Sequence, residues 1–270
     1  MKRRPGGDQA LAATRMPGMG DHEDAGRYAA AAGALLVEVR ARGAGGGWRL
    51  GDRGDVAANR CLLDLLAAEH GGDAVLSEES ADDRRRLTAD RVWIVDPLDG
   101  TREFSEPGRR DWAVHVALWE RGVDVRVGAV ALPAQGLVLS TASPPPSPEP
   151  RPGVRTVVVS RTRPPAVASV VAERLGAELV TMGSAGAKAM AVVLGEVDAY
   201  VHDGGQYEWD SAAPAAVARA AGLHVSRLDG APLAYNRPDS WLPDLLICRP
   251  ELADPILAVT AAPTRRGAAG

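Results

Sequence analysis

Cysteine, phenylalanine and long apolar runs are scarce in this chain. Its 270 residues include two cysteines, Cys61 and Cys248, and one phenylalanine, Phe104. Two cysteines make no disulfide framework, so the simplest interpretation is a reducing compartment, and we expect a cytoplasmic protein. No segment approaches the roughly 20 uninterrupted apolar residues that a membrane span needs, so we expect no membrane partner.

An excess of positive charge is also missing. The chain has 31 Lys and Arg against 35 Asp and Glu, a formal net charge of -4, and aromatic residues make up only 4% of it. Proteins that bind a nucleic-acid polymer need a basic surface to neutralise the phosphate backbone. A polymer is therefore excluded as a partner, whereas a small phosphorylated nucleotide is not.

The N-terminus lacks the apolar segment of a signal peptide. Residues 2–4 are basic, but residues 5–9 read PGGDQ where the apolar segment should follow. We interpret residues 1–20 as a disordered N-terminal extension, with Met16 and Met19 as alternative start sites.

What the chain does contain is typical of a globular protein: 46% hydrophobic and 24% charged residues. The length fits one large domain or two small ones. Segment 143–153, SPPPSPEPRPG, carries six prolines and is expected to be a linker or exposed loop. It would separate an N-terminal α+β half, residues 21–142, from a C-terminal α/β half, residues 154–270.

Hydrophobic periodicity and turn residues predict the secondary structure. In the N-terminal half they predict helices over 24–42 and 55–69, strands over 74–76 and 92–95, and an antiparallel meander over 112–119, 123–130 and 137–141. In the C-terminal half they predict strands over 154–160, 179–182, 198–201 and 245–248, alternating with helices over 166–175, 185–194 and 210–221, and then a C-terminal helix. The glycine cluster 43–47 lacks the Lys-Ser/Thr of a phosphate-binding loop and is interpreted as a flexible loop.

Two predicted strands end in acidic loops, SEES at 77–80 and DPLDGT at 96–101. Asp96 and Asp99, placed around a proline turn, can converge on one point together with the Leu98 carbonyl. Oxygen ligands of this kind suit Mg²⁺. The amides of Gly100 and Thr101 suit an anion. The alternative for this segment taken alone is an ordinary capped turn.

Further acids lie elsewhere in the sequence. Asp55 lies near the start of a predicted helix, and Asp210 opens another, where an N-cap is the alternative role. Glu79 is interpreted as a solvated acid. The five histidines show no metal-ligand spacing. Carboxylates gathered at 4 Å would repel by about 4 kcal/mol per pair at a dielectric constant near 20. Without cations some of them would have to protonate, and a dianionic phosphate could join them only if two or three Mg²⁺ ions supplied the compensating charge.

Three segments in this order, LSEES (76–80), WIVDPLDGT (93–101) and WDSAA (209–213), resemble the inositol monophosphatase superfamily of Mg²⁺-dependent, lithium-sensitive phosphatases. The resemblance covers about residues 24–259. The segments DPLDGTREF, DWAVHVALW, VVVSRTRP, GSAGAKAM and EWDSAA resemble its CysQ branch, whose members are 3'(2'),5'-bisphosphate nucleotidases. The resemblance implies an α/β (layered α+β) fold, an αβαβα sandwich, and a homodimer. It also implies hydrolysis of the 3'-phosphate of adenosine 3',5'-bisphosphate in sulfate assimilation.

The resemblance also implies roles for individual residues. Glu78, Asp96 and the Leu98 carbonyl would hold one Mg²⁺, and Asp96, Asp99 and Asp210 a second, with two or three ions in all. Asp55 and Thr101 would orient the attacking water. The family usually has Thr or Ala before that acid where this chain has Gly54, so Asp52 is the alternative.

Substrate contacts are expected from residues of the C-terminal half as well as from Gly100, Thr101 and Asp210. These further residues are Ser160, Arg161, Gly183, Ser184, Lys188 and Glu208. For Arg161 and Lys188 the alternative is a solvated surface charge. Trp209 is interpreted as core packing rather than a platform for a base. The alternative functions are an inositol-1-phosphate or fructose-1,6-bisphosphate phosphatase and, in a different class, a non-catalytic nucleotide or metal sensor.

Overall fold

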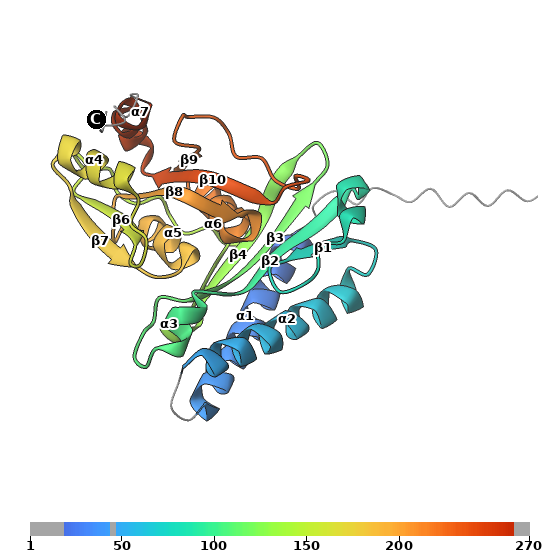
Figure 1. Cartoon of the computed structure of the whole chain (residues 1–270). Helices are drawn as coiled ribbons and strands as arrows, with labels where there is room; N and C mark the ends of the chain where they lie inside the picture. The colour runs from blue at the N-terminus through green and yellow to red at the C-terminus, as the bar shows by residue number, and fades with distance from the viewer. Residues whose placement is uncertain (1–18, 44–46, 262–270) are drawn as a thin grey trace, which may run out of the picture.

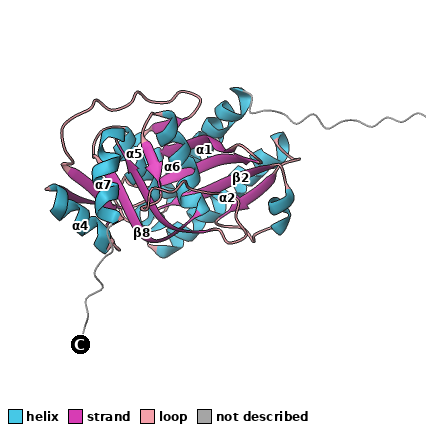
Figure 2. Ribbon diagram, turned by 90° about the horizontal axis from the view of Figure 1, so that it is seen from above, coloured by secondary structure: helices cyan, strands magenta, loops and turns pink. Residues whose placement is uncertain are grey.

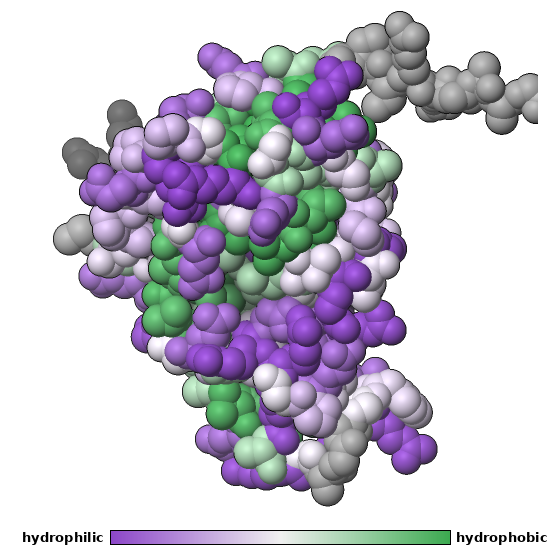
Figure 3. All heavy atoms as spheres, turned by 90° about the vertical axis from the view of Figure 1, so that its left-hand side faces the viewer, coloured by the Kyte–Doolittle hydropathy of each residue, from purple (hydrophilic) through white to green (hydrophobic). Residues whose placement is uncertain are grey.

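The computed structural model describes residues 19–43 and 47–261. Within these residues, two five-stranded sheets alternate with three layers of helices, so the layers run αβαβα (Figure 1). A view from above shows helices lying across the strands of both sheets (Figure 2). This is the predicted sandwich. The face shown in Figure 3 mixes hydrophilic residues with small apolar patches.

The first sheet has the strand order β1-β2-β3-β4-β5. Its strands are β1 (Ala74–Ser77), β2 (Arg91–Asp99), β3 (Ala113–Glu120), β4 (Asp124–Leu132) and β5 (Leu137–Ser140). Strand β1 is parallel to β2, and the remaining pairs are antiparallel, as the meander predicted. Helices α1 (Met19–Arg42) and α2 (Trp48–Glu69) pack on its outer face around a core that includes Tyr28, Trp93 and Trp112. Short helices η1 (Arg84–Thr88), α3 (Thr101–Ser105) and η2 (Pro133–Gln135) lie in the connections.

The second sheet has the strand order β7-β6-β8-β10-β9. Its strands are β6 (Thr156–Ser160), β7 (Glu178–Met182), β8 (Ala199–Tyr207), β9 (His224–Ser226) and β10 (Trp241–Cys248). Helices α5 (Ala185–Val193) and α6 (Glu208–Ala220) fill the layer between the sheets, and their alanines and valines join the largest core. Helices α4 (Ala166–Leu175), η3 (Pro250–Leu252) and α7 (Ala253–Thr260) cover the outer face.

Several element boundaries differ from the prediction. Helix α1 begins at Met19, so the last two residues of the expected extension are helical, while residues 1–18 and most of the glycine cluster lie outside the described residues. Helix α2 begins at Trp48, which places Asp55 inside the helix rather than near its start. A Cβ on Gly54 would lie 2.8 Å from both Leu98 Cδ2 and Phe104 Cε1. Glycine is a poor helix former, but at position 54 it allows α2 to pack closely against Leu98 and Phe104.

Two further boundaries affect the acidic residues. Strand β2 continues to Asp99, so the DPLD segment is strand with an irregularity in its pairing between Asp96 and Asp99. Helix α6 begins at Glu208, so Asp210 is its third residue and not its N-cap. The Asp210 carboxylate accepts a hydrogen bond from the Tyr207 amide at 2.6 Å. Strand β8 is longer than predicted because β10 pairs with it as far as Tyr207.

A glycine brings α6 against the first sheet. A Cβ on Gly128 of β4 would lie 2.8 Å from Ala216 Cβ and 3.0 Å from the Ala213 carbonyl oxygen of α6. Residues 211–218 of this helix are all buried. The contact of helix and strand backbones fixes the position of Asp210, at the start of α6, relative to the strands that carry the other acids.

No helix among the described residues is long and apolar enough to cross a membrane. The proline-rich segment after β5 contains neither a helix nor a strand, apart from an isolated bridge between Ser140 and Ser143.

Candidate active site

Three acids far apart in the sequence meet between the sheets. One oxygen each of Asp96, Asp99 and Asp210 lies within 4.8 Å of the others. Strand β2 supplies the first two and helix α6 the third, and Asp96 is only 1% exposed. The structure therefore brings together the carboxylates that the sequence predicted as metal ligands.

Glu78, which follows β1, joins this group. Burial and the charges of Asp210 and Asp99 raise its pKa to about 7, although a hydrogen bond with Asp96 opposes the shift. Burial and the Asp99 charge raise the pKa of Asp210 to about 6. Burial and the Glu78 charge raise the pKa of Asp96 well above its ordinary value. Each of these carboxylates is thus hard to ionise beside the others unless a cation is added.

Asp99 is the exception in the group. Burial opposes its ionisation, but the charges of His115 and Lys188 outweigh burial and hold its pKa well below the ordinary value. His115 Nε2 lies 3.2 Å from Asp99 Oδ2, and the amides of Ala185 and Gly186 donate to the same carboxylate at 3.1 and 2.6 Å. Asp99 therefore also joins β2 to the start of α5.

His115 is a site residue that the sequence analysis missed. It is fully buried, and its Nδ1 lies 2.9 Å from the Trp209 carbonyl oxygen. A Cβ on Gly186 would lie 2.0 Å from His115 Nε2, so only glycine leaves room for the ring. The register of β3 on β2 pairs His115 with Asp96, which is the feature that could have identified it.

The donor set fits a hard cation. Asp96, Asp99 and Asp210, with Glu78 beside them, offer the carboxylate oxygens that such a cation prefers. Among the described residues no arginine or lysine forms an ion pair with any of these four acids. His115 and Lys188 influence mainly Asp99. A bound metal ion would supply the positive charge that the remaining acids lack.

Asp55 meets Thr101 beside this cluster. Thr101 Oγ1 lies 3.3 Å from Asp55 Oδ1 and 3.2 Å from the Leu98 carbonyl oxygen. Burial, together with the charge of Glu79, raises the pKa of Asp55 to about 7. Asp52 is exposed on the same helix. The structure thus places Asp55, and not Asp52, next to the threonine.

A pocket of about 440 Å³ opens onto the cluster. Such a volume suits a small ligand. Among the acids and the predicted substrate contacts, its lining includes Glu78, Asp99, Asp210, Ser160, Arg161, Gly183, Ser184 and Lys188. Gly100 and Thr101 are not part of this lining, and lie where β2 turns into α3.

The basic residues of the pocket differ in their partners. Lys188 is 4% exposed, so it is not a solvated surface charge, and its Nζ donates to the carbonyl oxygens of Gly183 and Ser184. Burial lowers its pKa. Arg161 is bound by the carboxylates of Glu103 and Glu106 at 2.7 and 2.9 Å. Arg163 lines the pocket and forms no ion pair with any described residue.

Glu208 lies outside the pocket lining. It is buried, and its two carboxylate oxygens accept hydrogen bonds from the amides of Asn236 and Arg237, each at 2.7 Å. Both oxygens thus hold the loop at residues 236–237, and the expected contact of Glu208 with a sugar hydroxyl stays a prediction. Trp209 packs against the central core, in agreement with its interpretation from the sequence.

The extended β8 and its partner β10 add pocket residues that the sequence analysis missed. They are Tyr200, His202, Gln206, Tyr207 and Trp241. Both ring nitrogens of His202 are buried without a hydrogen-bond partner. Burial is the main cause that lowers the pKa of His202 to about 4, so its ring is neutral at physiological pH.

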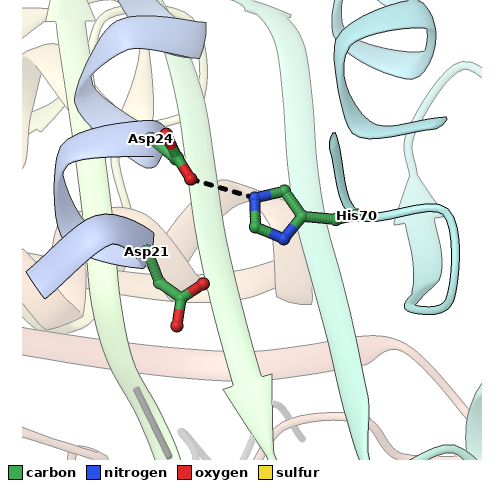
Figure 4. Close-up of side chains that lie close together, drawn as sticks. All are labelled: Asp21, Asp24 and His70. Carbon is green, nitrogen blue, oxygen red and sulfur yellow. Dashed lines mark hydrogen bonds and ion pairs between the residues drawn. The ribbon is translucent and has the colours of Figure 1, made fainter. Parts of the chain in front are cut away.

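A second acidic cluster lies near the start of α1 (Figure 4). Asp21, Asp24 and His70 each offer one ligand atom within 4.8 Å of the others, and His70 Nε2 lies 3.1 Å from Asp24 Oδ2. Arg91 reaches into this cluster and contacts Asp21 at 3.0 Å and Asp73 at 3.1 Å. An arginine already supplies positive charge here.

Comparison with known proteins agrees with this geometry. A model of the inositol monophosphatase family matches residues 51–146 and 151–259. A 3'-phosphoadenosine 5'-phosphate phosphatase of Mycobacterium bovis is 56% identical over 238 residues, which is 85% of this chain and 89% of the relative. The 3'(2'),5'-bisphosphate nucleotidase CysQ of Escherichia coli K12 is 33% identical over 200 residues, 70% of this chain and 80% of the relative.

A solved structure shows the same fold. CysQ from Bacteroides thetaiotaomicron, described as a bacterial member of the inositol monophosphatase family, superposes with a TM-score of 0.73 at 25% identity. The match covers 87% of this chain and 99% of that chain. The resemblance expected from the short acidic motifs is therefore confirmed across nearly the whole fold, and the chain belongs to the inositol monophosphatase family.

Proposed function

We propose that this protein is a Mg²⁺-dependent phosphatase that converts adenosine 3',5'-bisphosphate to AMP and phosphate. The observation that carries the proposal is a single pocket that joins the carboxylate cluster to Lys188 and Arg163. A substrate with two phosphate groups needs both a metal site and a separate cationic site. The 56% identity to 3'-phosphoadenosine 5'-phosphate phosphatases supports the same substrate.

Glu78, Asp96, the Leu98 carbonyl, Asp99 and Asp210 would hold the metal ions. When bound, two or three Mg²⁺ ions would supply positive charge that offsets these acids and polarises the phosphate. Metal and phosphate should therefore bind interdependently.

Asp55 and Thr101 would position the attacking water. Thr101 lies within hydrogen-bond distance of the Asp55 carboxylate, which accepts a proton as the water attacks phosphorus in line with the leaving 3'-oxygen. A pKa near 7 suits a general base at physiological pH. Water attacks directly, so no phosphorylated enzyme forms, and detection of one by burst kinetics would contradict this mechanism.

The remaining predicted contacts would hold the rest of the substrate. The Gly100 and Thr101 amides would bind the reacting phosphate, and Ser160, Gly183, Ser184 and Lys188 would face the nucleotide. Arg163, which no described carboxylate neutralises, would bind the second phosphate. Arg161 is held by Glu103 and Glu106, so it would contribute less net charge.

Phosphate release from a substrate panel, with and without Mg²⁺, tests the proposal. Adenosine 3',5'-bisphosphate should exceed inositol 1-phosphate and fructose 1,6-bisphosphate by at least about tenfold in kcat/KM, which is about 1.4 kcal/mol. A smaller preference would favour a phosphatase of broader range. Binding of nucleotide without any turnover would instead favour a nucleotide or metal sensor.

The cellular setting is proposed from the same relatives. We expect a cytoplasmic homodimer that acts in sulfate assimilation and is inhibited by lithium. Light scattering coupled to size-exclusion chromatography tests the dimer, and phosphate release in the presence of Li⁺ tests the inhibition. We also propose that residues 143–153 divide the chain into an N-terminal and a C-terminal half.

A further inference from the structure

Two exposed aromatic side chains line the same pocket as the carboxylates. Tyr207 is 47% exposed and Trp241 is 49% exposed, whereas Trp93 and Trp112 are fully buried. Large aromatic surfaces contribute most when they are buried, either in a core or against a ligand. These two rings therefore leave a planar apolar area available inside a pocket that is otherwise mostly polar.

The two aromatic residues are neighbours across the second sheet. Tyr207 ends β8 and is paired with Trp241, which begins β10. Side chains of directly paired residues lie on the same face of a sheet. The Tyr207 ring stacks on the Trp209 ring, with centroids 4.8 Å apart and planes 11° apart. Trp209 packs against the central core, so Tyr207 rests on a fixed support.

A glycine holds the indole of Trp241 close to the backbone. Gly205 has a φ of +88°, and a Cβ at this position would lie 2.5 Å from Trp241 Nε1. Glycine is thus required here both for the left-handed conformation and for the close approach of the ring. The indole lies against the backbone of β8 instead of extending freely into solvent.

The aromatic pair lies next to the metal-binding acids. The Tyr207 amide donates to the carboxylate of Asp210, one turn further along the chain. In a nucleoside 3'-phosphate only the ribose separates the phosphate from the planar base. A phosphate held at the carboxylate cluster would therefore leave the base within reach of this pair, whereas inositol and sugar phosphates have no planar group to place there.

We propose that Trp241 and Tyr207 form the surface on which the nucleobase of the substrate stacks, and that this surface makes the enzyme prefer nucleotides to sugar phosphates. The inference rests on the proposed function, whose substrate it explains. Stacking of a base on an aromatic ring tolerates different bases, since every base has a π face. The surface should thus select for a base without strongly distinguishing adenine from guanine.

Competition by AMP and by ribose 5-phosphate, which is AMP without its base, isolates the stacking contact. In the Mg²⁺-loaded enzyme, Trp241→Ala should raise the inhibition constant of AMP at least about fivefold and leave that of ribose 5-phosphate nearly unchanged. Tyr207→Ala should act in the same direction, and Trp241→Phe should retain most of the affinity for AMP. Trp48→Ala is the matched control, because Trp48 is 71% exposed and lies outside the pocket lining.

If Trp241→Ala weakened the binding of AMP and of ribose 5-phosphate equally, Trp241 would have a merely structural role and the inference would be overturned. An unchanged ratio of the two constants would overturn it as well, as would a wild-type enzyme that binds AMP no better than ribose 5-phosphate. The proposed function fails separately, if the wild-type enzyme does not prefer adenosine 3',5'-bisphosphate in the substrate panel. A base-dependent affinity in that case would still support the stacking surface.

Discussion

Two clusters of acids in this molecule, each with buried members, differ in the positively charged groups that contact them. The arginine cluster has Arg91 at its centre, 3.0 Å from Asp21, 3.1 Å from Asp73 and 2.9 Å from Glu120. The site cluster consists of Glu78, Asp96, Asp99 and Asp210. No arginine or lysine among the described residues forms an ion pair with the site cluster.

The two clusters differ in how far the protein itself offsets the charge of their acids. Burial opposes the charge of Arg91, but Asp21 and Asp73 outweigh burial and raise its pKa. Arg91 therefore offsets part of the charge of its cluster, although burial still raises the pKa of Glu120. In the site cluster the pKa values of three acids, Glu78, Asp96 and Asp210, are raised. The cationic groups of the two clusters thus differ in their reach: Arg91 contacts all three acids of its cluster, whereas His115 and Lys188 act mainly on Asp99.

Removing one charge from the site cluster should produce the largest effect. We expect Asp99→Asn to lower kcat/KM about a thousandfold or more, because this acid would complete the proposed metal site. The protein should remain folded, since the asparagine side chain has the same shape and keeps one oxygen acceptor for the amides of α5. Phosphate release and circular dichroism measure the two properties. Asp24→Asn, in the acidic region near His70, is the control and should retain activity. Undiminished turnover by Asp99→Asn would refute the metal mechanism.

Removing the cation from the arginine cluster should act on stability instead. Arg91→Met leaves three acids without their shared partner, and we expect the free energy of unfolding to fall by about 3 kcal/mol. Denaturant unfolding measures this loss, and the activity of the folded fraction should be retained. Arg60→Met removes an exposed ion pair and should change stability by less than about 0.5 kcal/mol. A similar loss of unfolding free energy in Arg91→Met and Arg60→Met would show that the arginine cluster contributes no more than an exposed ion pair.

The stability of the metal-free protein should depend on pH through the acids of the site cluster. Asp210 and Glu78 have pKa values of about 6 and about 7, above those of carboxyls in an unfolded chain, near 4. The folded protein therefore binds these protons more tightly, and its stability should fall as the pH rises from about 4 to about 7. Mg²⁺ should stabilise the protein strongly at pH 8 and little at pH 5. Melting temperatures measured in EDTA and in Mg²⁺ at the two pH values test this expectation. Equal stabilisation by Mg²⁺ at pH 5 and pH 8 would contradict it.

The smallest effect is expected from Glu79, an exposed acid near Asp55. After burial, its charge is the largest cause that raises the pKa of Asp55. Glu79→Gln should shift the acidic limb of the kcat/KM profile to lower pH by a fraction of a unit, with kcat at pH 8 nearly unchanged. A shift to higher pH, or a large loss of kcat, would show that Glu79 has another role.

The site acids were predictable because a short motif contains much of their geometry. Asp96 and Asp99 are three residues apart at the end of one strand, and the matching segments around Glu78 and Asp210 indicated their grouping. His115 and Glu208 were not predictable in the same way. The role of His115 depends on the register of β3 against β2, and that of Glu208 on a loop at residues 236–237.

The length of β8 was missed for a related reason. The sequence HDGGQ at 202–206 is typical of a turn, and only its pairing with β10 makes it a strand. Local preference is weak in such a segment, so a partner strand decides its conformation. The aromatic pair could therefore not be predicted from the sequence, because Tyr207 and Trp241 become neighbours only through the pairing of β8 with β10.

The contact at Gly128 has a consequence for how activity can be lost. Asp210 lies beside Asp96 and Asp99 because α6 packs directly on β4, and we expect one added methyl group at Gly128 to move the helix outward. Such a change alters no charge and no residue of the pocket, yet it would separate Asp210 from Asp96 and Asp99. The spacing of the three carboxylates is in this sense set by a contact between two backbones, so a loss of function can originate at a residue that takes no part in the chemistry.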